Sequence, residues 1–269
     1  MNHNLTYDLD FKDYLAYDAI SSSGIVQLRR SPAHYQEYLK QTDEETPAKL
    51  LGKQIHAAIL EPDKFKDYIV MPEKFDRRTK LGRDEYNSFM AENHEKTIVS
   101  FDNYQVIEGI LSSCYKHPTV SKLLNGGKNE VSCFWQDHLT GVTCKARFDK
   151  LLDNDMIIDV KSCEDASIHG FKKSINKYLY HIQSSFYLEG LSVIRGKLLN
   201  DFIHIAVEKE PPYGIGIYTL DDVSLAAGSD EIRKHLEIYS ECKKNNIWPC
   251  YPDNVQNISI SSYLLEVKE

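Results

Sequence analysis

The sequence predicts a mixed α/β (α+β) fold, and two patterns support this. Apolar residues recur at helical spacing up to about residue 125, and short alternating runs rich in Ile and Val follow from Glu130 onward. Helices, then a strand meander, then further helix and strands favour a central mixed sheet flanked by helices. We expect residues 1–269 to form a single domain, mainly helical over 1–125 and sheet-bearing over 126–269.

Start and stop signals divide the first part of the chain into helices. Ser21-Ser22-Ser23 precedes an apolar-periodic stretch, which is a helix-start signal, and Pro32 interrupts that stretch and begins a new helix. Pro62 ends a later helix whose apolar residues share one side. The further expected helices are Pro32–Gln41, Ala48–Leu60, Asp84–Glu95 and Asp102–Tyr115, with a loop or arm at Pro72–Gly82.

The second part of the chain alternates like strands and contains turn residues at short intervals. Leu139-Thr140-Gly141 and Asp153-Asn154-Asp155 are typical of turns. The strands expected around them are Glu130–Asp137, Val142–Leu152 and Met156–Ser162. Beyond them we expect a helix over Ile168–Gly190, a strand pair Phe202–Val207 and Gly216–Leu220 around Pro211-Pro212, and a final helix over Asp222–Lys243.

Composition narrows the class of protein. Apolar residues make up 42% and charged residues 27% of the 269, a soluble globular balance. The N-terminus is polar and acidic, and no stretch approaches the ~18 consecutive apolar residues of a membrane helix, so we expect a cytoplasmic protein without a membrane partner. The six cysteines lack C-x-x-C spacing and are expected to be reduced, several of them buried.

The net charge of −8 argues against a protein that coats nucleic acid, but it permits a local basic groove. Two segments are locally basic. Lys74–Arg83 has five basic residues and one acid, and Lys161–Lys197 has six basic residues and three acids. Such runs are most often solvated faces, so charge alone does not assign them a ligand.

One predicted hairpin brings several charged residues together. If its turn is centred on Asn154, antiparallel pairing places Asp149 opposite Asp159 and Arg147 opposite Lys161. Side chains alternate along a strand, so all four share one face. Carboxylates this close repel unless a cation neutralises them, and oxygen ligands favour Mg²⁺, with Mn²⁺ a second candidate. A surface hairpin with cross-strand ion pairs is the alternative.

These residues resemble the PD-(D/E)XK nuclease superfamily, with Phe148-Asp149 in place of Pro-Asp and Asp159-Val160-Lys161 as the D-x-K element. Within it the chain looks like the RecE-type (exonuclease VIII-like) exonucleases. The matching stretches are Ser21–Tyr35 with Ser31-Pro32-Ala33-His34-Tyr35, Leu51–Pro62 with His56, the basic arm Asp76–Arg83, and Gln183 with Tyr187 as the Q-x-x-x-Y element, so that the resemblance spans about residues 14–255.

The resemblance implies a restriction-endonuclease-like core and a role for each matching residue. His56, Asp149, Asp159 and the carbonyl of Val160 would bind metal, with Glu130 as a further acidic ligand through water. Lys161 would position the attacking water, and Gln183 and Tyr187, one helical turn apart, would hold the lysine, the water or the phosphate. Arg147, Arg77, Arg78 and Lys80 would contact DNA, although Arg147 has an alternative role as the partner of a carboxylate.

The implied activity is 5′→3′ exonuclease hydrolysis of linear double-stranded DNA. It would leave a 3′ single strand for a RecT-like annealing protein in phage-type recombination. The resemblance also implies a homo-oligomer such as a tetramer.

Three alternatives stay open at this point. An endonuclease would use the same site. A CRISPR-associated or helicase-linked nuclease with an iron–sulfur cluster needs an N-terminal cysteine and three late ones, whereas this chain has Ser31-Pro32 and only Cys242 and Cys250. A non-catalytic DNA-binding module would not need to keep His56 together with Asp149, Asp159 and Lys161.

Overall fold

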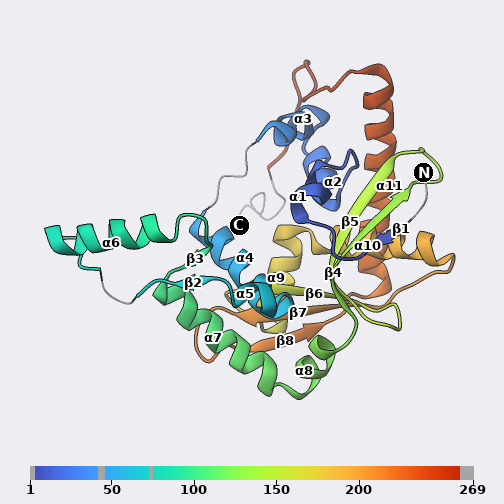
Figure 1. The fold of residues 1–269 in the computed structure, drawn as a ribbon. Coiled ribbons are helices and arrows are strands. Elements are labelled where there is room, and N and C mark those ends of the chain that lie inside the picture. The colour runs from blue at the N-terminus through green and yellow to red at the C-terminus, as the bar shows by residue number, and fades with distance from the viewer. Residues whose placement is uncertain (1–3, 42–45, 73–74, 261–269) are drawn as a thin grey trace, which may run out of the picture.

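A computed structural model describes residues 4–41, 46–72 and 75–260, and its centre is a six-stranded mixed sheet (Figure 1). The strand order is β1-β4-β5-β6-β7-β8. The strands are β1 (Asn4–Thr6), β4 (Lys128–Gln136), β5 (Thr143–Leu151), β6 (Ile157–Cys163), β7 (Phe202–Glu208) and β8 (Ile215–Tyr218). Within this sheet, β6 and β7 pair in parallel and the other neighbouring strands pair antiparallel, so the predicted mixed fold is confirmed.

The register of the β5–β6 hairpin is the one predicted from a turn centred on Asn154. Lys150 pairs with Ile158 and Leu151 with Ile157. The ladder ends there, so Asp149 and Asp159 lie just beyond its last pair. The site therefore begins where β5 and β6 cease to be hydrogen-bonded neighbours.

One face of the sheet is covered by four helices that are not contiguous in sequence. They are α2 (Ser22–Leu28), α3 (Pro32–Lys40), α10 (Tyr180–Arg195) and α11 (Asp222–Asn245). Their core includes Phe148 from β5, Trp135 from β4 and Phe186 from α10. Ser21 caps α2 by accepting from the backbone of Gly24, and Pro32 is the first residue of α3, as the start signals predicted.

The opposite face packs against α4 (Pro47–Leu60), α7 (Phe101–Lys116) and α8 (Pro118–Asn125). Ile158 and Val160 of β6 enter this core, whereas Ile157 enters the first one. Successive side chains of β6 point to opposite faces of the sheet, and both faces are covered. The strand is therefore buried on both sides, which explains its run of Ile and Val. Outside these two helical layers lie the short helices α1 (Phe11–Ala16) and α5 (Pro62–Phe65), and helix α9 (Ile168–Tyr178).

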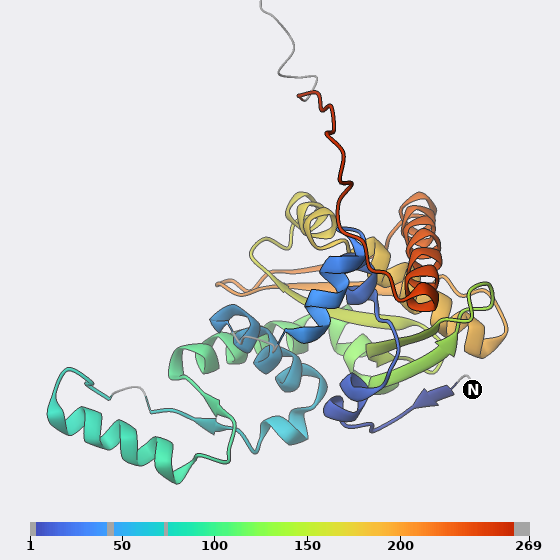
Figure 2. The ribbon, with the colours of Figure 1, turned by 90° about the horizontal axis from the view of Figure 1, so that it is seen from above.

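An arm projects from the body and carries helix α6 (Lys80–Glu92) (Figures 1 and 2). The two-stranded parallel pair β2 (Ile69–Val70) and β3 (Ile98–Val99) forms its base. The predicted arm is therefore present, although α6 begins at Lys80, ahead of the expected Asp84. Lys74, the first residue of the basic segment, lies outside the described residues.

The expected single helix over Ile168–Gly190 is wrong, because the chain breaks at Leu179. Leu179 has a left-handed backbone, with φ of 58°, and separates α9 from α10. No glycine, proline or asparagine marks this position, so the sequence carried no ordinary stop signal. The strand β1, which pairs with β4, and the helices α1 and α8 were not predicted.

The described cysteines are all free thiols, five of them buried and only Cys250 exposed, as expected. No helix among the described residues is long and apolar enough to cross a membrane.

Candidate active site

The strands β5 and β6 diverge at the site, and the side chain of Asp149 replaces the next backbone hydrogen-bond partner of β6. The backbone N–H of Val160 donates to Oδ2 of Asp149 at 2.7 Å. The carboxylate of Asp149 is thereby fixed against β6 by a charge-assisted hydrogen bond.

Three side chains from separate elements meet beside this carboxylate. One ligand atom each from His56 of α4, Glu130 of β4 and Asp149 of β5 lies within 4.8 Å of the others. Nδ1 of His56 is 3.6 Å from Oδ2 of Asp149. This is the only such group of three or more His, Cys, Asp or Glu side chains found among the described residues.

Glu130 joins the cluster through an unusual backbone conformation. Its φ is 51°, in the left-handed region that residues with a side chain rarely adopt. Asn129 and Val131 pair with Lys150 and Phe148, so the interruption falls opposite Asp149. Strained backbone of this kind costs free energy and concentrates at functional sites.

Asp159 is fully buried and accepts hydrogen bonds from three side chains. Nζ of Lys161 lies 2.8 Å from its carboxylate, and Nε2 of Gln183 donates to Oδ1 at 2.9 Å. Nδ1 of His204 is 3.2 Å from Oδ2. Asp159 is not part of the three-residue cluster, and its role as a metal ligand stays a prediction.

The charges of the site shift each other's protonation. Burial, together with the charges of Asp159 and Glu130, raises the pKa of Asp149. Burial opposes ionisation of Asp159, but the Lys161 ammonium and the hydrogen bond from His204 hold its pKa well below the usual range. Burial likewise opposes the charge of Lys161, and the two aspartates outweigh it and raise the lysine pKa. Asp159 and Lys161 therefore stand as an ion pair at neutral pH.

The predicted Gln183 and Tyr187 both face this ion pair from α10. Gln183 bonds Asp159 directly and also hydrogen-bonds Tyr187. The ring of Tyr187 packs against Phe148 at 5.3 Å, and burial raises its pKa well above the usual value. Tyr187 is thus a neutral hydroxyl that holds Gln183 in place.

The His56, Glu130 and Asp149 donors fit a divalent cation. One imidazole nitrogen and two carboxylate oxygens converge from three elements, and both carboxylates are negatively charged when ionised. This set of ligands is compatible with Mg²⁺ or Mn²⁺. A cation held there would polarise a phosphate oxygen and help to generate a nucleophile at neutral pH. The carbonyl of Val160, a further predicted ligand, stays untested.

Arg147 does not face Lys161 in a recorded strand pair, because the β5–β6 ladder ends before it. Its Nε donates to Glu130 at 2.7 Å and its Nη1 to the Leu9 carbonyl at 2.9 Å. The structure thus supplies the carboxylate partner that the sequence left as an alternative. Contact of Arg147 with phosphate stays untested.

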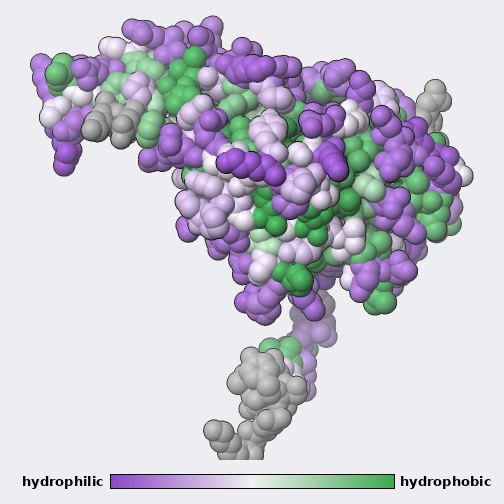
Figure 3. Space-filling model, turned by 90° about the horizontal axis from the view of Figure 1, so that it is seen from below, coloured by the Kyte–Doolittle hydropathy of each residue, from purple (hydrophilic) through white to green (hydrophobic). Residues whose placement is uncertain are grey.

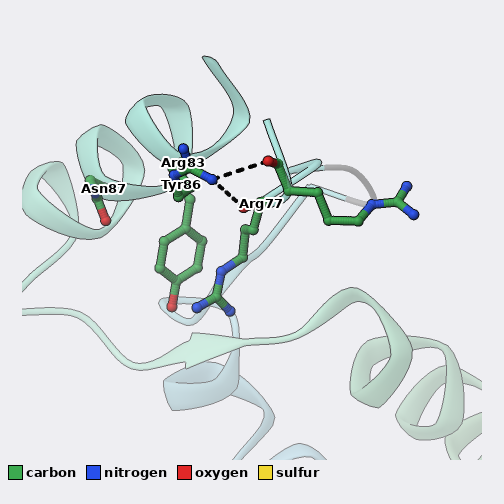
Figure 4. A pocket seen from close by; sticks show the side chains of 5 residues that line it. Arg77, Arg83, Tyr86 and Asn87 are labelled. Carbon is green, nitrogen blue, oxygen red and sulfur yellow. Dashed lines mark hydrogen bonds between the residues drawn. The ribbon is translucent and has the colours of Figure 1, made fainter. Parts of the chain in front are cut away.

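The arm keeps its arginines away from the hairpin. Arg77, Arg78 and Arg83 line an open hollow of about 430 Å³ together with Tyr86 and Asn87 (Figure 4). Nη1 of Arg83 donates to the carbonyls of Arg77 and Arg78, which fixes the loop before α6. The Arg77 guanidinium lies 4.4 Å from the centre of the Tyr86 ring. Lys80 is the first residue of α6.

Sequence reasoning missed two buried residues of the site, His204 and Ser184. Asp159 and His204 are paired across the parallel strands β6 and β7. Nε2 of His204 is 3.0 Å from Oγ of Ser184 on α10. A polar residue within the apolar run Phe202–Val207 was the available signal, but the parallel register that aims it at Asp159 is not readable from the sequence.

One solved structure shows the same fold at low identity. A crystal structure from Eubacterium rectale, provisionally described as an exonuclease, is 17% identical with a TM-score of 0.65, covering 97% of this chain and 99% of that one. A structure described as SSO0001 is 14% identical with a TM-score of 0.29, and the match covers 87% of this chain and 92% of that one. None of the curated proteins matches the chain.

A family model described as a PDDEXK-like domain of unknown function (DUF3799) matches residues 21–259, which include every residue of the candidate site. The matched range begins at the cap of α2 and extends beyond α11. The chain therefore belongs to this PDDEXK-like family.

Proposed function

We propose that the chain is a metal-dependent 5′→3′ exodeoxyribonuclease that hydrolyses linear double-stranded DNA and leaves a 3′ single strand. One observation carries the proposal. The Asp159–Lys161 ion pair lies beside a convergent His56, Glu130 and Asp149 cluster at the diverging end of one hairpin. The family membership and the resemblance to RecE-type exonucleases support the nuclease chemistry.

The chain's own residues have distinct tasks in this proposal. Lys161, positively charged and anchored by Asp159, neutralises charge that develops on the phosphate and orients the attacking water. Gln183 holds the anchoring carboxylate from α10. His56, Glu130 and Asp149 would hold the cation, which would polarise the phosphate. The attacking water would form the new P–O bond in line with the bond to the 3′-oxygen, which would break, and the leaving 3′-oxygen would take up a proton to give a 3′-hydroxyl and a 5′-phosphate.

The arm supplies a second contact with DNA in this proposal. Arg77 and Arg78, with Lys80, offer cations on a projecting segment whose surface is largely hydrophilic on the face seen from below (Figure 3). Arginine side chains suit phosphate oxygens because of their planar fork of donors. The arm would therefore follow the phosphate backbone away from the site of hydrolysis.

The cytoplasmic setting of the proposal rests on the polar N-terminus and the lack of a long apolar stretch, and its partners rest on the resemblance. We propose that the enzyme acts in the cytoplasm, passes its single strand to a RecT-like annealing protein, and works as a homo-oligomer such as a tetramer.

The test uses linear duplex DNA labelled separately at the 5′ ends and at internal positions, with Mg²⁺, with Mn²⁺ and with EDTA. Wild type is compared with Lys161→Ala and with Lys116→Ala, an exposed lysine on α7 that serves as the matched control. We expect early release of 5′ label in Mg²⁺ from wild type and control, and none from Lys161→Ala or in EDTA.

Two other results would redirect the assignment. Internal nicking of circular DNA would keep the site but make the protein an endonuclease. Strong DNA binding with equal inertness of wild type and Lys161→Ala across metals and DNA forms would overturn the catalytic proposal and favour a binding module.

A further inference from the structure

Helix α9 presents a cationic surface beside the candidate site. Lys172, Lys173 and Lys177 are exposed on it, and the helix from Ile168 to Tyr178 contains no acidic residue. This helix lies within the basic segment Lys161–Lys197, and neither the cluster at His56 nor the arm uses it. Its charge complements a phosphate backbone.

A series of nearly parallel aromatic rings runs from the end of α9 into the site. Tyr178 is 54% exposed, and its ring stacks on Tyr180 with centroids 5.6 Å apart and an angle of 23°. Tyr180 stacks in turn on His204, with centroids 5.8 Å apart and an angle of 29°. The series therefore connects solvent to the buried histidine that contacts Asp159.

The same series adjoins the lysine of the site. Nζ of Lys161 lies 5.0 Å from the centre of the Tyr180 ring, and Phe171 supports Tyr180 from the buried side of α9 at 6.0 Å. The left-handed residue Leu179 lies between the two tyrosines and ends the helix there. Tyr178 is thus only one ring removed from the lysine.

We propose that Tyr178 and the lysines of α9 bind unpaired nucleotides of the DNA strand that enters the site. A base would stack on the exposed Tyr178 ring and extend the existing series. The lysines would contact the flanking phosphates. Lys177, whose ammonium lies 5.0 Å from the centre of the Tyr178 ring, would turn from that ring to a phosphate as the base stacks. This combination of aromatic platform and cations is how proteins hold single-stranded nucleic acid.

The spacing agrees with such a role. Two ring contacts of 5.6 Å and 5.0 Å separate Tyr178 from the Lys161 ammonium. Each nucleotide of a B-DNA strand advances about 3.4 Å along the axis, so a base on Tyr178 lies within a few nucleotides of the reacting phosphate. Separating a terminal base pair exposes bases for this ring. The inference rests on the proposed nuclease function and specifies which form of the substrate the site holds.

The first experiment measures binding without hydrolysis. Fluorescence anisotropy in EDTA gives the affinity of a short single-stranded oligodeoxynucleotide for wild type, Tyr178→Ala and Tyr178→Phe, with Tyr115→Ala as control. Tyr115 is a tyrosine of similar exposure, 58%, on α7. Loss of one base–ring stack should weaken binding about 5- to 150-fold in Tyr178→Ala, while Tyr178→Phe and the control stay near wild type.

A second measurement identifies the partner of the ring. A set of oligonucleotides carries one abasic nucleotide, placed at a different position in each. At one position the missing base should weaken binding to wild type but should not weaken binding to Tyr178→Ala any further. Replacing Lys172, Lys173 and Lys177 by Ala should reduce the salt dependence, by about 0.7 in slope for each phosphate contact removed.

Each result decides one of the two ideas. No measurable single-strand binding by wild type, or equal binding by wild type and Tyr178→Ala, overturns the inference even if DNA is hydrolysed in Mg²⁺. A Tyr178-dependent single-strand affinity without hydrolysis in any metal supports the surface and removes the nuclease proposal. Since Tyr178 is exposed, unchanged thermal unfolding of its variants separates lost binding from lost folding.

Discussion

Asp159 shows how much of the site depends on residues that never meet solvent. Its carboxylate is held from three directions, by Lys161 on its own strand, Gln183 on α10 and His204 on β7. The histidine is itself held by Ser184, whose hydroxyl also donates to the carbonyl of Tyr180. Such outer partners fix the orientation of the groups that do the chemistry.

We expect His204→Asn to lower kcat about 10- to 100-fold with little change in the KM for DNA, because the carboxylate anchoring Lys161 loses one of its donors. Steady-state hydrolysis of labelled duplex measures both constants. Thermal unfolding should show the variant still folded in the assay. A wild-type kcat, or a change confined to KM, would contradict a positioning role for His204.

The residues that sequence reasoning found are those whose geometry is local. Asp149, Asp159 and Lys161 belong to one hairpin, so a turn position was enough to place them together. His204 is 45 residues from Asp159, and its contact depends on the parallel pairing of β6 with β7. His56 was reached only through the family resemblance, because a histidine among apolar residues of a helix has no ligand signal of its own.

At the scale of elements, a buried ion pair joins the β4–β5 turn to α11. Both oxygens of Asp137 accept from Arg233, at 2.7 and 2.9 Å, and Thr140 of the turn also donates to this carboxylate. Although burial opposes its ionisation, the hydrogen bonds from Arg233 and Thr140 lower the pKa of Asp137 to about 2. The predicted turn is therefore locked to a helix nearly 100 residues later by a contact that no local pattern shows.

Stability at this contact should depend on pH. The ordinary aspartate pKa is about 3.9, so the stabilisation is complete above that pH and is lost as the pH falls toward 2. We expect Asp137→Asn to lower the melting temperature. At pH 7 the variant should lose up to about 2 kcal/mol of stability, after allowing for the partial exposure of Arg233, and about half as much near pH 3, which lies between the ordinary and the lowered pKa. The exposed Asp153→Asn control should show no such change with pH, and a pH-independent deficit in Asp137→Asn would contradict the ion pair.

The helices and strands also show where tertiary contacts, and not local sequence signals, determine the bounds of an element. Serine and proline starts placed α2 and α3 correctly, because a cap is a property of a few adjacent residues. Leu179 breaks a helix without a breaker residue, and β1 is only three residues long and exists because it pairs with β4. Neither feature has a cause within its own sequence window.

For the whole molecule, the net charge of −8 conceals an uneven distribution. The arm and α9 carry clusters of exposed cations, although single acids such as Asp76 and Asp165 lie close to them in sequence. Long-range attraction to DNA would therefore be weak, and binding would depend on these two surfaces.

We expect Arg77→Ala with Arg78→Ala to weaken duplex binding and to lower the slope of log affinity against log salt by up to about 2, since each duplex phosphate contact contributes about 0.9. The pair Lys116→Ala and Lys122→Ala, which removes equal charge from exposed positions on α7 and α8, is the matched control. Anisotropy titrations over a range of salt measure the slope. Equal slopes for both double variants would exclude the arm from the DNA contact.

The hydrogen bond from Val160 to Asp149 gives the two oxygens of this carboxylate different roles. Oδ2 completes the sheet by accepting the Val160 N–H, and it is also the oxygen nearest to His56. Withdrawing it would orphan a backbone donor at a cost of about 1–3 kcal/mol. Oδ1 does not accept this backbone hydrogen bond. A ligand that binds Oδ1 would therefore leave the hydrogen bond between β5 and β6 in place, and the hairpin would keep its geometry when that ligand leaves.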